Sequence, residues 1–310
     1  MMTSARAAQA SYLVLPQHPD PSVTVLAYLC ERFPHIEGAI WRDRMSQGLV
    51  TWQDGSLIDP TSQYRSCARV YYFREVVAET KIPFKVEILY QDAEIVIAYK
   101  PHFLPVTPSG NYVNECLVHR LRIATGIDTL VPAHRLDRET AGIVLLSANP
   151  DTRHQYHDLF KSKTINKQYH AIAKLTAELI EQYQVGQLRL PVAWTIENRL
   201  KPADPSFLMQ VVAGDANTHS EIRLVAVKGN LGLFELSPIT GKTHQLRVHM
   251  LSLGMPLLND RFYPELQPKG PDDFERPLQL LARELSFCDP ITHIDHHWQV
   301  PGLELERWLS

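Results

Sequence analysis

The stretch PAHRLDRETAGIVLLSA, residues 132–148, joins two halves of opposite character. Its second half, residues 142–148, is an apolar run of strand length, which predicts a strand buried in the core. Its first half carries His, Arg, Asp and Glu side chains directly before that strand. A loop anchored to a rigid element is a common position for catalytic groups. The stretch therefore predicts a functional loop, although a turn with its charges paired on the surface fits these residues equally well.

The segments around this stretch favour a mixed α+β domain. Two helices are expected, one opening at Asn149 as N-cap and running toward Phe160, the other ending at Gly254. Strands are expected at 86–90, 95–99, 165–173, 221–228 and 233–236. Strands outnumber helices, which favours a mostly antiparallel central sheet with flanking helices over a doubly wound sheet.

A change in composition near residue 80 predicts a domain boundary. Positive charge comes from arginine alone until Lys81. Before it, apolar residues at helical spacing and a hairpin over 49–58 predict a small module of two helices and strands. The expected organisation is an N-terminal tail at 1–22, this module at 23–80 and a large domain at 81–310.

The composition of the 310 residues is that of an ordinary globular protein, with 45% hydrophobic and 21% charged residues. The longest apolar runs are far shorter than the ~18–20 residues that cross a bilayer, and the N-terminus lacks the apolar core of a signal peptide. Four cysteines lie far apart without paired spacing, which fits a reducing compartment. We therefore expect a cytoplasmic protein.

Net charge argues mildly against a nucleic-acid partner, because the chain carries −3 with a pI near 6.5. The charge is uneven, however. Residues 153–174 hold five cations and one anion, a balance of +4, whereas residues 265–310 hold four cations and nine anions, a balance of −5. The first stretch can attract phosphates on a protein that is acidic elsewhere, although a solvated charged face is the simpler reading.

A second candidate site is TGKTHQLRVHM, residues 240–250. Its Gly-Lys-Thr triplet does not belong to a phosphate loop, because Leu236 stands where that loop needs its first glycine. Apolar spacing predicts a helix with His244 and Arg247 on one face, and its N-terminal N–H groups, with Lys242, suit a phosphate. An amphipathic surface helix without function is an equal alternative.

A third candidate is KQYHA, residues 167–171, in the basic stretch. Tyr169 in a strand is more often a packing residue than a catalytic one.

Taken together, these motifs resemble those of the RluA-type pseudouridine synthase family, which acts on ribosomal or transfer RNA. The resemblance rests on HRLDRETAG (134–142), KQYHA (167–171), PITGKTHQLRVHM (238–250) and LLARELSF (280–287), in the family's order. Departures are Ala141, where many members carry serine, and Lys242, where arginine is common. Residues 41–50 are similar to the core of an S4 RNA-binding domain, although the module lacks lysine.

The resemblance implies that the chain isomerises uridine in RNA to pseudouridine without cofactor or metal. Asp137 would be the essential carboxylate, attacking C1′ or removing the C2′ proton. Arg247 would pair with Asp137, and Tyr169 would lie against the uracil. Leu246 would form an apolar wall, and the remaining expected substrate-binding residues are His134, Arg135, Lys167, Lys242 and His244. RNA is the expected partner, with no membrane, and a monomer is expected.

Two rival functions are less well supported by the sequence. A metal-dependent hydrolase could use the pairs His154 with His157 or His244 with His249, but no full ligand set stands at a recognisable spacing. A non-catalytic RNA-binding protein would need a lost activity, although all three motif residues are present.

Overall fold

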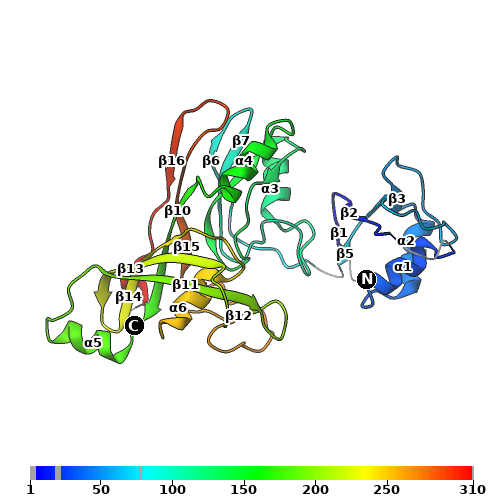
Figure 1. The fold of residues 1–310 in the computed structure, drawn as a ribbon. Helices are drawn as coiled ribbons and strands as arrows, with labels where there is room; N and C mark the ends of the chain where they lie inside the picture. Colours follow the sequence, from blue (N-terminus) through cyan, green and yellow to red (C-terminus); the bar gives the residue numbers. More distant parts are fainter. Residues whose placement is uncertain (1–4, 18–21, 77–78, 309–310) are drawn as a thin grey trace. The chain divides into compact units, whose positions relative to one another are not determined.

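A computed structural model describes residues 5–17, 22–76 and 79–308 (Figure 1). The chain forms two compact units, one comprising residues 1–80 with 108–115 and the other residues 81–107 with 116–310. The loop at 108–115 thus belongs with the first unit, although the sequence analysis placed it in the large domain. Glu79 explains this membership, because its carboxylate accepts the backbone N–H groups of Val113 and Asn114 at 2.5 and 2.7 Å.

The first unit is a small α/β module with its own apolar core. Helices α1 (Val25–Arg32) and α2 (Gly38–Ser46) pack on a sheet of strands β2 (Ser11–Val14), β4 (Arg69–Tyr72) and β3 (Val50–Trp52). Strands β1 (Ala5–Arg6) and β5 (Glu75–Val76) pair separately. The two helices and the hairpin after Leu49 are as expected. The predicted N-terminal tail is wrong where the chain is described, because β1 and β2 are paired strands; residues 1–4 and 18–21 lie outside the described residues.

The larger unit confirms the mixed α+β expectation. Its sheet has eleven strands, nine of them in the order β12-β11-β13-β14-β10-β15-β9-β7-β6, with β16 paired to β15 and β8 to β9. The strands are β6 (Glu87–Gln91), β7 (Ile95–Lys100), β8 (Val131–Pro132), β9 (Ala141–Ser147), β10 (Asn166–Lys174), β11 (Val192–Pro202), β12 (Met209–Val212), β13 (Thr218–Lys228), β14 (Leu231–Pro238), β15 (Leu280–Cys288) and β16 (Asp295–Gln299). The helices are α3 (Leu117–Thr125), α4 (Arg153–Lys161), α5 (Ala177–Gln184) and α6 (Gln245–Ser252), and a 3₁₀ turn, η1, spans Glu306–Trp308.

One junction joins the two halves of this sheet. Among the described strands, β15 and β9 form the one parallel pair, at Leu281 with Ala141 and at Ala282 with Gly142. On one side of it, α4 lies with β6 and β7; on the other, α6 lies by β11 and β12 (Figure 1). A separate apolar core fills each half. The loop that precedes β9 therefore lies at the meeting point of two rigid packed halves.

One helix begins later than its sequence predicts. Asn149 stabilises a turn and does not cap the helix: its side chain accepts the N–H of Asp151 and donates to Glu94. The chain makes a turn there, and α4 begins at Arg153 with Thr152 as its N-cap. No helix in the described part of the chain is long and apolar enough to cross a membrane.

Candidate active site

Asp137 lies in a tight turn that the start of β9 holds in place. The N–H of Thr140 donates to the carbonyl of Asp137 at 3.1 Å, and β9 begins at the next residue. Gly142 has φ +127°, and a Cβ there would stand 2.2 Å from the carbonyl oxygen of Ala282 on β15. Only glycine allows this close approach of the two strands. The turn is therefore fixed by backbone packing as well as by its own hydrogen bond.

Lys100, at the end of β7, stabilises the same turn through hydrogen bonds from its side chain. Its side chain is fully buried, and its Nζ donates to the carbonyls of Pro101, Leu104 and Arg138 at 3.0, 2.7 and 3.1 Å. Burial lowers the pKa of Lys100 to about 7, although the negative charges of Glu139 and Asp137 act to raise it. This lysine ties a core strand to the residue that follows Asp137.

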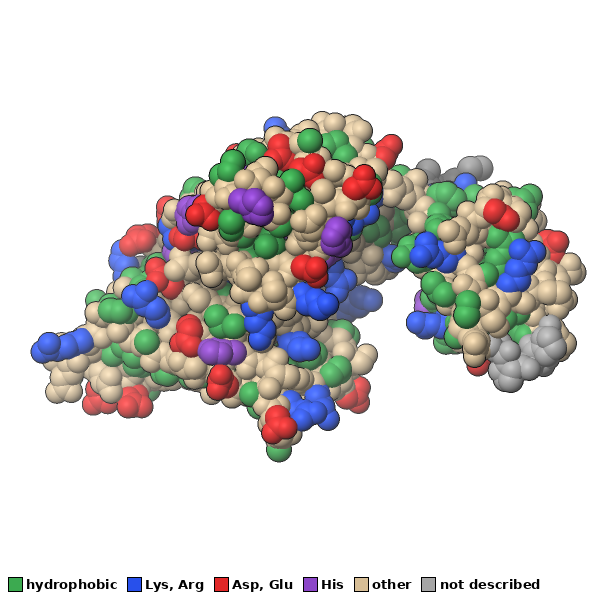
Figure 2. Space-filling model, turned by 45° about the horizontal axis from the view of Figure 1, so that its top comes forward, with side chains coloured by type: hydrophobic (Ala, Val, Ile, Leu, Met, Phe, Trp, Pro, Cys, Tyr) green, Lys and Arg blue, Asp and Glu red, His purple; other side chains and the backbone are tan. Residues whose placement is uncertain are grey.

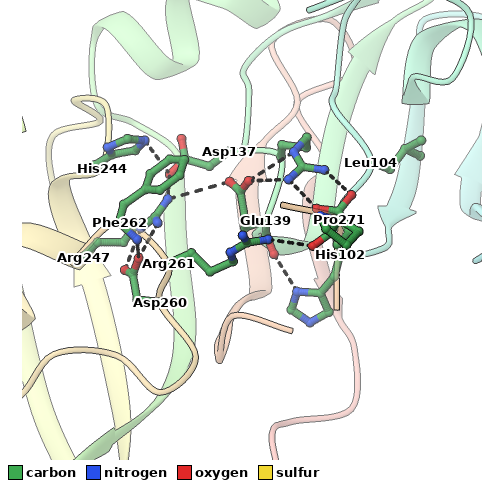
Figure 3. A network of polar contacts seen from close by, with 12 residues as sticks. His102, Leu104, Asp137, Glu139, His244, Arg247, Asp260, Arg261, Phe262 and Pro271 are labelled. Atoms are coloured by element: carbon green, nitrogen blue, oxygen red, sulfur yellow. Dashed lines mark hydrogen bonds and ion pairs between the residues drawn. The ribbon is translucent and has the colours of Figure 1, made fainter. Parts of the chain in front are cut away.

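Arg247 of α6 links three carboxylates (Figure 3). Its Nε and Nη2 donate to the two oxygens of Asp260 at 2.8 and 2.5 Å. Its Nη1 lies 3.6 Å from Asp137 Oδ2 and 3.8 Å from Glu139 Oε2, and it is buried without a hydrogen bond to the described residues. The expected pairing of Arg247 with Asp137 is present only as this longer contact, because Asp260 takes the bidentate position.

Most of the expected site residues line a cavity of about 90 Å³. Eight of the nine are in its wall: Arg135, Asp137, Lys167, Tyr169, Lys242, His244, Leu246 and Arg247. They come from the turn before β9, from β10, from the segment that leads into α6 and from the first turn of α6. The sheet thus brings together three motifs that stand far apart in the sequence.

His134 is the exception, because it is not among the residues that line the cavity. Its ring stacks on Phe160 with centroids 4.5 Å apart, and its Nε2 accepts the N–H of Leu145 at 3.2 Å. Burial, with the nearby charge of Lys167, lowers the pKa of His134 to about 3, so the ring is neutral. His134 therefore supports β9 through its hydrogen bond to Leu145.

Tyr169 and His244 face Asp137 as uncharged groups. Burial and the charge of Asp137 raise the pKa of Tyr169 far above its usual value. Burial lowers the pKa of His244, whose Nε2 lies 3.9 Å from Asp137 Oδ2 and whose Nδ1 is 2.9 Å from the hydroxyl of Tyr263. Asp137 is therefore faced by an intact phenol and an imidazole held in place by a tyrosine.

Helix α6 is buried on every side, which differs from the amphipathic pattern that its sequence predicts. Residues 245–250 are all buried. His249 Nε2 lies 3.1 Å from both Asn198 and Thr218, so the polar side chains have partners inside the protein. At the helix start, the side chain of Gln245 accepts the N–H of Lys242, which leaves fewer free N–H groups for a phosphate than expected.

Three supporting residues were missed by the sequence analysis: Lys100, Asp260 and Gln245. Asp260 lies outside the quoted motifs, and its partner Arg247 is thirteen residues away in the sequence. A lysine directly after the apolar run 95–99 was a usable signal for Lys100, since burial of that strand tends to bury its end. Among the described residues, no group of three or more His, Cys, Asp or Glu side chains is placed to hold a metal ion.

Comparison with known proteins identifies the family of the chain. The sequence profile of the RNA pseudouridylate synthase family matches residues 94–252. The dual-specificity RNA pseudouridine synthase RluA of Haemophilus influenzae is 33% identical over 207 residues, covering 66% of this chain and 88% of the relative. An uncharacterized RNA pseudouridine synthase of Synechocystis is 27% identical over 242 residues, covering 77% and 79%.

A solved structure gives the same result. The human RNA pseudouridylate synthase domain containing 4 has a TM-score of 0.53 and 25% identity, covering 71% of this chain and 92% of that structure. The fold and the sequence are thus those of an RNA pseudouridine synthase, an isomerase. Among these enzymes, the chain belongs to the RluA-type family.

Proposed function

We propose that the enzyme converts specific uridines of ribosomal or transfer RNA to pseudouridine, with Asp137 as the essential carboxylate and without a cofactor. One observation carries this proposal: Asp137, Tyr169 and Arg247 line a single cavity. A uridine within folded RNA must leave its stack to enter, at a cost of about a few kcal/mol. The protein is proposed to act as a monomer, since one chain supplies the whole lining.

The geometry suits Asp137 to act on the sugar. Its side chain is 27% exposed, so it can meet a substrate, while Arg247 and His244 hold it from the protein side. In the proposed reaction the N1–C1′ bond breaks, the uracil turns within the cavity, and C5 bonds to C1′ as the C5 proton leaves. Asp137 either bonds to C1′ in the interval or takes the C2′ proton to give a glycal.

Arg247 and Tyr169 would serve this chemistry in different ways. The free Nη1 of Arg247 is placed to balance charge on Asp137 and on the departing uracil. The ring of Tyr169 would stack on the uracil. Burial, together with the charge of Asp137, raises the pKa of Tyr169. The phenol therefore stays protonated and would position the uracil as a neutral ring.

The remaining lining residues would hold the RNA. Arg135 and Lys242 are exposed at the cavity, and Lys167 is half-buried in its wall. Lysine and arginine contacts to phosphates set affinity and register and do not select sequence. Figure 2 shows Lys and Arg side chains interspersed with Asp and Glu on one face of the protein, so phosphate contacts would be local.

The decisive test is the Asp137→Asn variant. Wild-type enzyme should release tritium from C5-labelled uridine in transcripts of ribosomal or transfer RNA, whereas the variant should fold, bind the same RNA and release none. Circular dichroism and filter binding provide the controls for fold and binding. Pseudouridine formation by Asp137→Asn would refute the role of this carboxylate.

A further inference from the structure

A second, larger cavity lies in a fork of the sheet. Strand β10 begins at Asn166 and pairs there with β15, but its register with β14 begins only at Tyr169, opposite Leu236. The first residues of β10 and the last residues of β14 form the arms of the fork. A cavity of about 260 Å³ lies between them, lined by Lys163, Ile165, Asn166, Lys167, Gln168, Ser237, Pro238, Ile239, Glu284 and Ser286.

The fork adjoins the active-site cavity. Lys167 and Pro238, one from each arm, line both cavities. Tyr169, where β10 and β14 come together, lines the active-site cavity alone. A strand of RNA whose uridine lies at Tyr169 therefore has the fork beside it.

The lining has the mixed chemistry of a nucleotide site. Lys163 is exposed and Lys167 half-buried, and these two cations are opposed by Glu284, which pairs with Arg283. Amide and hydroxyl side chains supply hydrogen-bond donors and acceptors, and Ile239, at 42% exposure, supplies an apolar edge. Positive charge suits a phosphate, while amides and an apolar edge suit a sugar or an unstacked base.

We propose that the fork holds the nucleotide next to the target uridine in the same RNA strand. This inference rests on the proposed function, because it takes the active-site cavity to hold the extruded uridine. The fork would make recognition depend on a second nucleotide, so that an isolated uridine would bind without its contribution.

Short oligouridines can test this without turnover. The parent protein is the full chain with Asp137→Asn, titrated with uridine 5′-monophosphate and with the uridine dinucleotide and trinucleotide, and binding is followed by NMR of the ligand protons. The test variant adds Lys163→Gln and Asn166→Ala. The control variant adds Lys174→Gln, an exposed lysine at the other end of β10.

The parent should bind the dinucleotide about tenfold more tightly than the mononucleotide, which corresponds to about 1.4 kcal/mol. The Lys163→Gln and Asn166→Ala changes should remove most of that gain and leave mononucleotide affinity unchanged. Lys174→Gln should alter neither affinity.

The proposal is overturned by equal affinities for one and two nucleotides, or by an equal loss for both in the test variant. It is also overturned if inorganic phosphate binds at the fork while the dinucleotide gains nothing over the mononucleotide. Failure of the proposed function is a separate result, seen as the absence of pseudouridine in transcripts treated with the wild-type enzyme.

Discussion

Arg247 shows how a single side chain can organise the site. Burial alone would lower the pKa of Arg247, but its hydrogen bonds to Asp260 and the charges of Asp137 and Glu139 raise it above the usual value. The guanidinium is therefore a permanent cation. Asp260 accepts hydrogen bonds from two nitrogens of the Arg247 guanidinium. The carboxylate of Asp260 also accepts the N–H groups of Phe262 and Tyr263. This arrangement leaves Nη1 directed at Asp137 and Glu139.

Replacing Asp260 with asparagine should therefore impair chemistry more than RNA binding. Loss of the carboxylate leaves a buried arginine without its close counter-ion, and Arg247 should shift toward Asp137. We expect the single-turnover rate to fall about 10- to 100-fold, or about 1.4–2.7 kcal/mol, with less effect on RNA affinity. The free energy of unfolding should fall by about 3 kcal/mol, since breaking a buried pair is costly.

Quench-flow rates, filter binding and urea unfolding measure these three effects. Asp272→Asn is the matched control, because Asp272 makes a similar bidentate pair with the more exposed Arg138. A normal single-turnover rate in Asp260→Asn would contradict the positioning role.

Individual residues differ in how far the sequence predicts them. The three motif residues Asp137, Tyr169 and Arg247 do line one cavity, because each motif is local and the fold only has to bring the motifs together. Asp260 was missed because its pairing depends on how a loop returns to α6. His134 is outside the lining of this cavity, because its ring packs on Phe160.

At the scale of elements, the junction of β9 with β15 fixes the catalytic turn. Gly142 combines a positive φ with a close approach to the backbone of Ala282. Gly142→Ala should therefore lower the free energy of unfolding by about 4 kcal/mol, through backbone strain and overlap together. Gly126→Ala is the control, because Gly126 has φ +72° but open space around it, and it should cost only about 1–2 kcal/mol.

Urea unfolding of both variants tests this comparison. Equal losses for the two glycines would mean that the backbone approach at Gly142 contributes nothing.

Strand β7 carries a pH-sensitive contact at its end. Burial lowers the pKa of Lys100 from 10.5 to about 7, so between these values the unfolded chain binds a proton that the folded chain gives up. The free energy of unfolding should therefore rise with pH across this window, by at most about 1.4 kcal/mol per pH unit. Lys100→Met removes this titration and the three hydrogen bonds to carbonyl oxygens.

The free energy of unfolding of wild type should rise relative to that of Lys100→Met by about 2–3 kcal/mol from about pH 7 to about pH 9. Chemical denaturation at each pH measures it, with the exposed Lys174→Met as control. A difference that stays constant or shrinks with rising pH would show that the folded pKa is not lowered.

The elements predicted best are strands, because one face or both faces of a strand pack into the core and leave a clear apolar pattern in the sequence. The strands around 95–99 and 142–148 and the hairpin from 221 to 236 were expected and are present. The start of α4 was not, because an asparagine serves equally well in a turn and at a helix cap. The burial of α6 was missed because its polar side chains find partners within the fold.

The whole molecule divides its charge between two units of different composition. Residues 1–80 hold seven arginines and eight acids, a balance of −1. Four of those arginines lie over aromatic rings of the same unit, at 4.4 to 5.5 Å from the ring centroids: Arg32, Arg44, Arg65 and Arg69. Arg44 is buried, whereas Arg32, Arg65 and Arg69 are exposed and lie over rings at the surface of the unit. The likeness to an S4 domain stays a prediction, and the net charge favours a unit that adds little to phosphate binding.

The salt dependence of RNA affinity shows whether the first unit contacts RNA phosphates or contributes no such contacts. Each phosphate contact adds a slope of about 0.7–0.9 to the fall of log K with log salt concentration. Lys242→Gln, at the active-site cavity, should reduce the slope by about one contact, because an exposed lysine there would meet the RNA backbone. Arg65→Gln with Arg69→Gln should leave it unchanged, since both arginines cover rings of their own unit.

Filter binding of unfractionated transfer RNA between about 50 and 200 mM salt gives both slopes on full-length protein. Circular dichroism checks that the arginine variants keep the first unit folded. A reduced slope in the arginine variants would assign RNA contact to the first unit despite its net charge. It would also mean that arginines stacked on aromatic rings still reach phosphates, as a planar guanidinium can when its edge stays open to solvent.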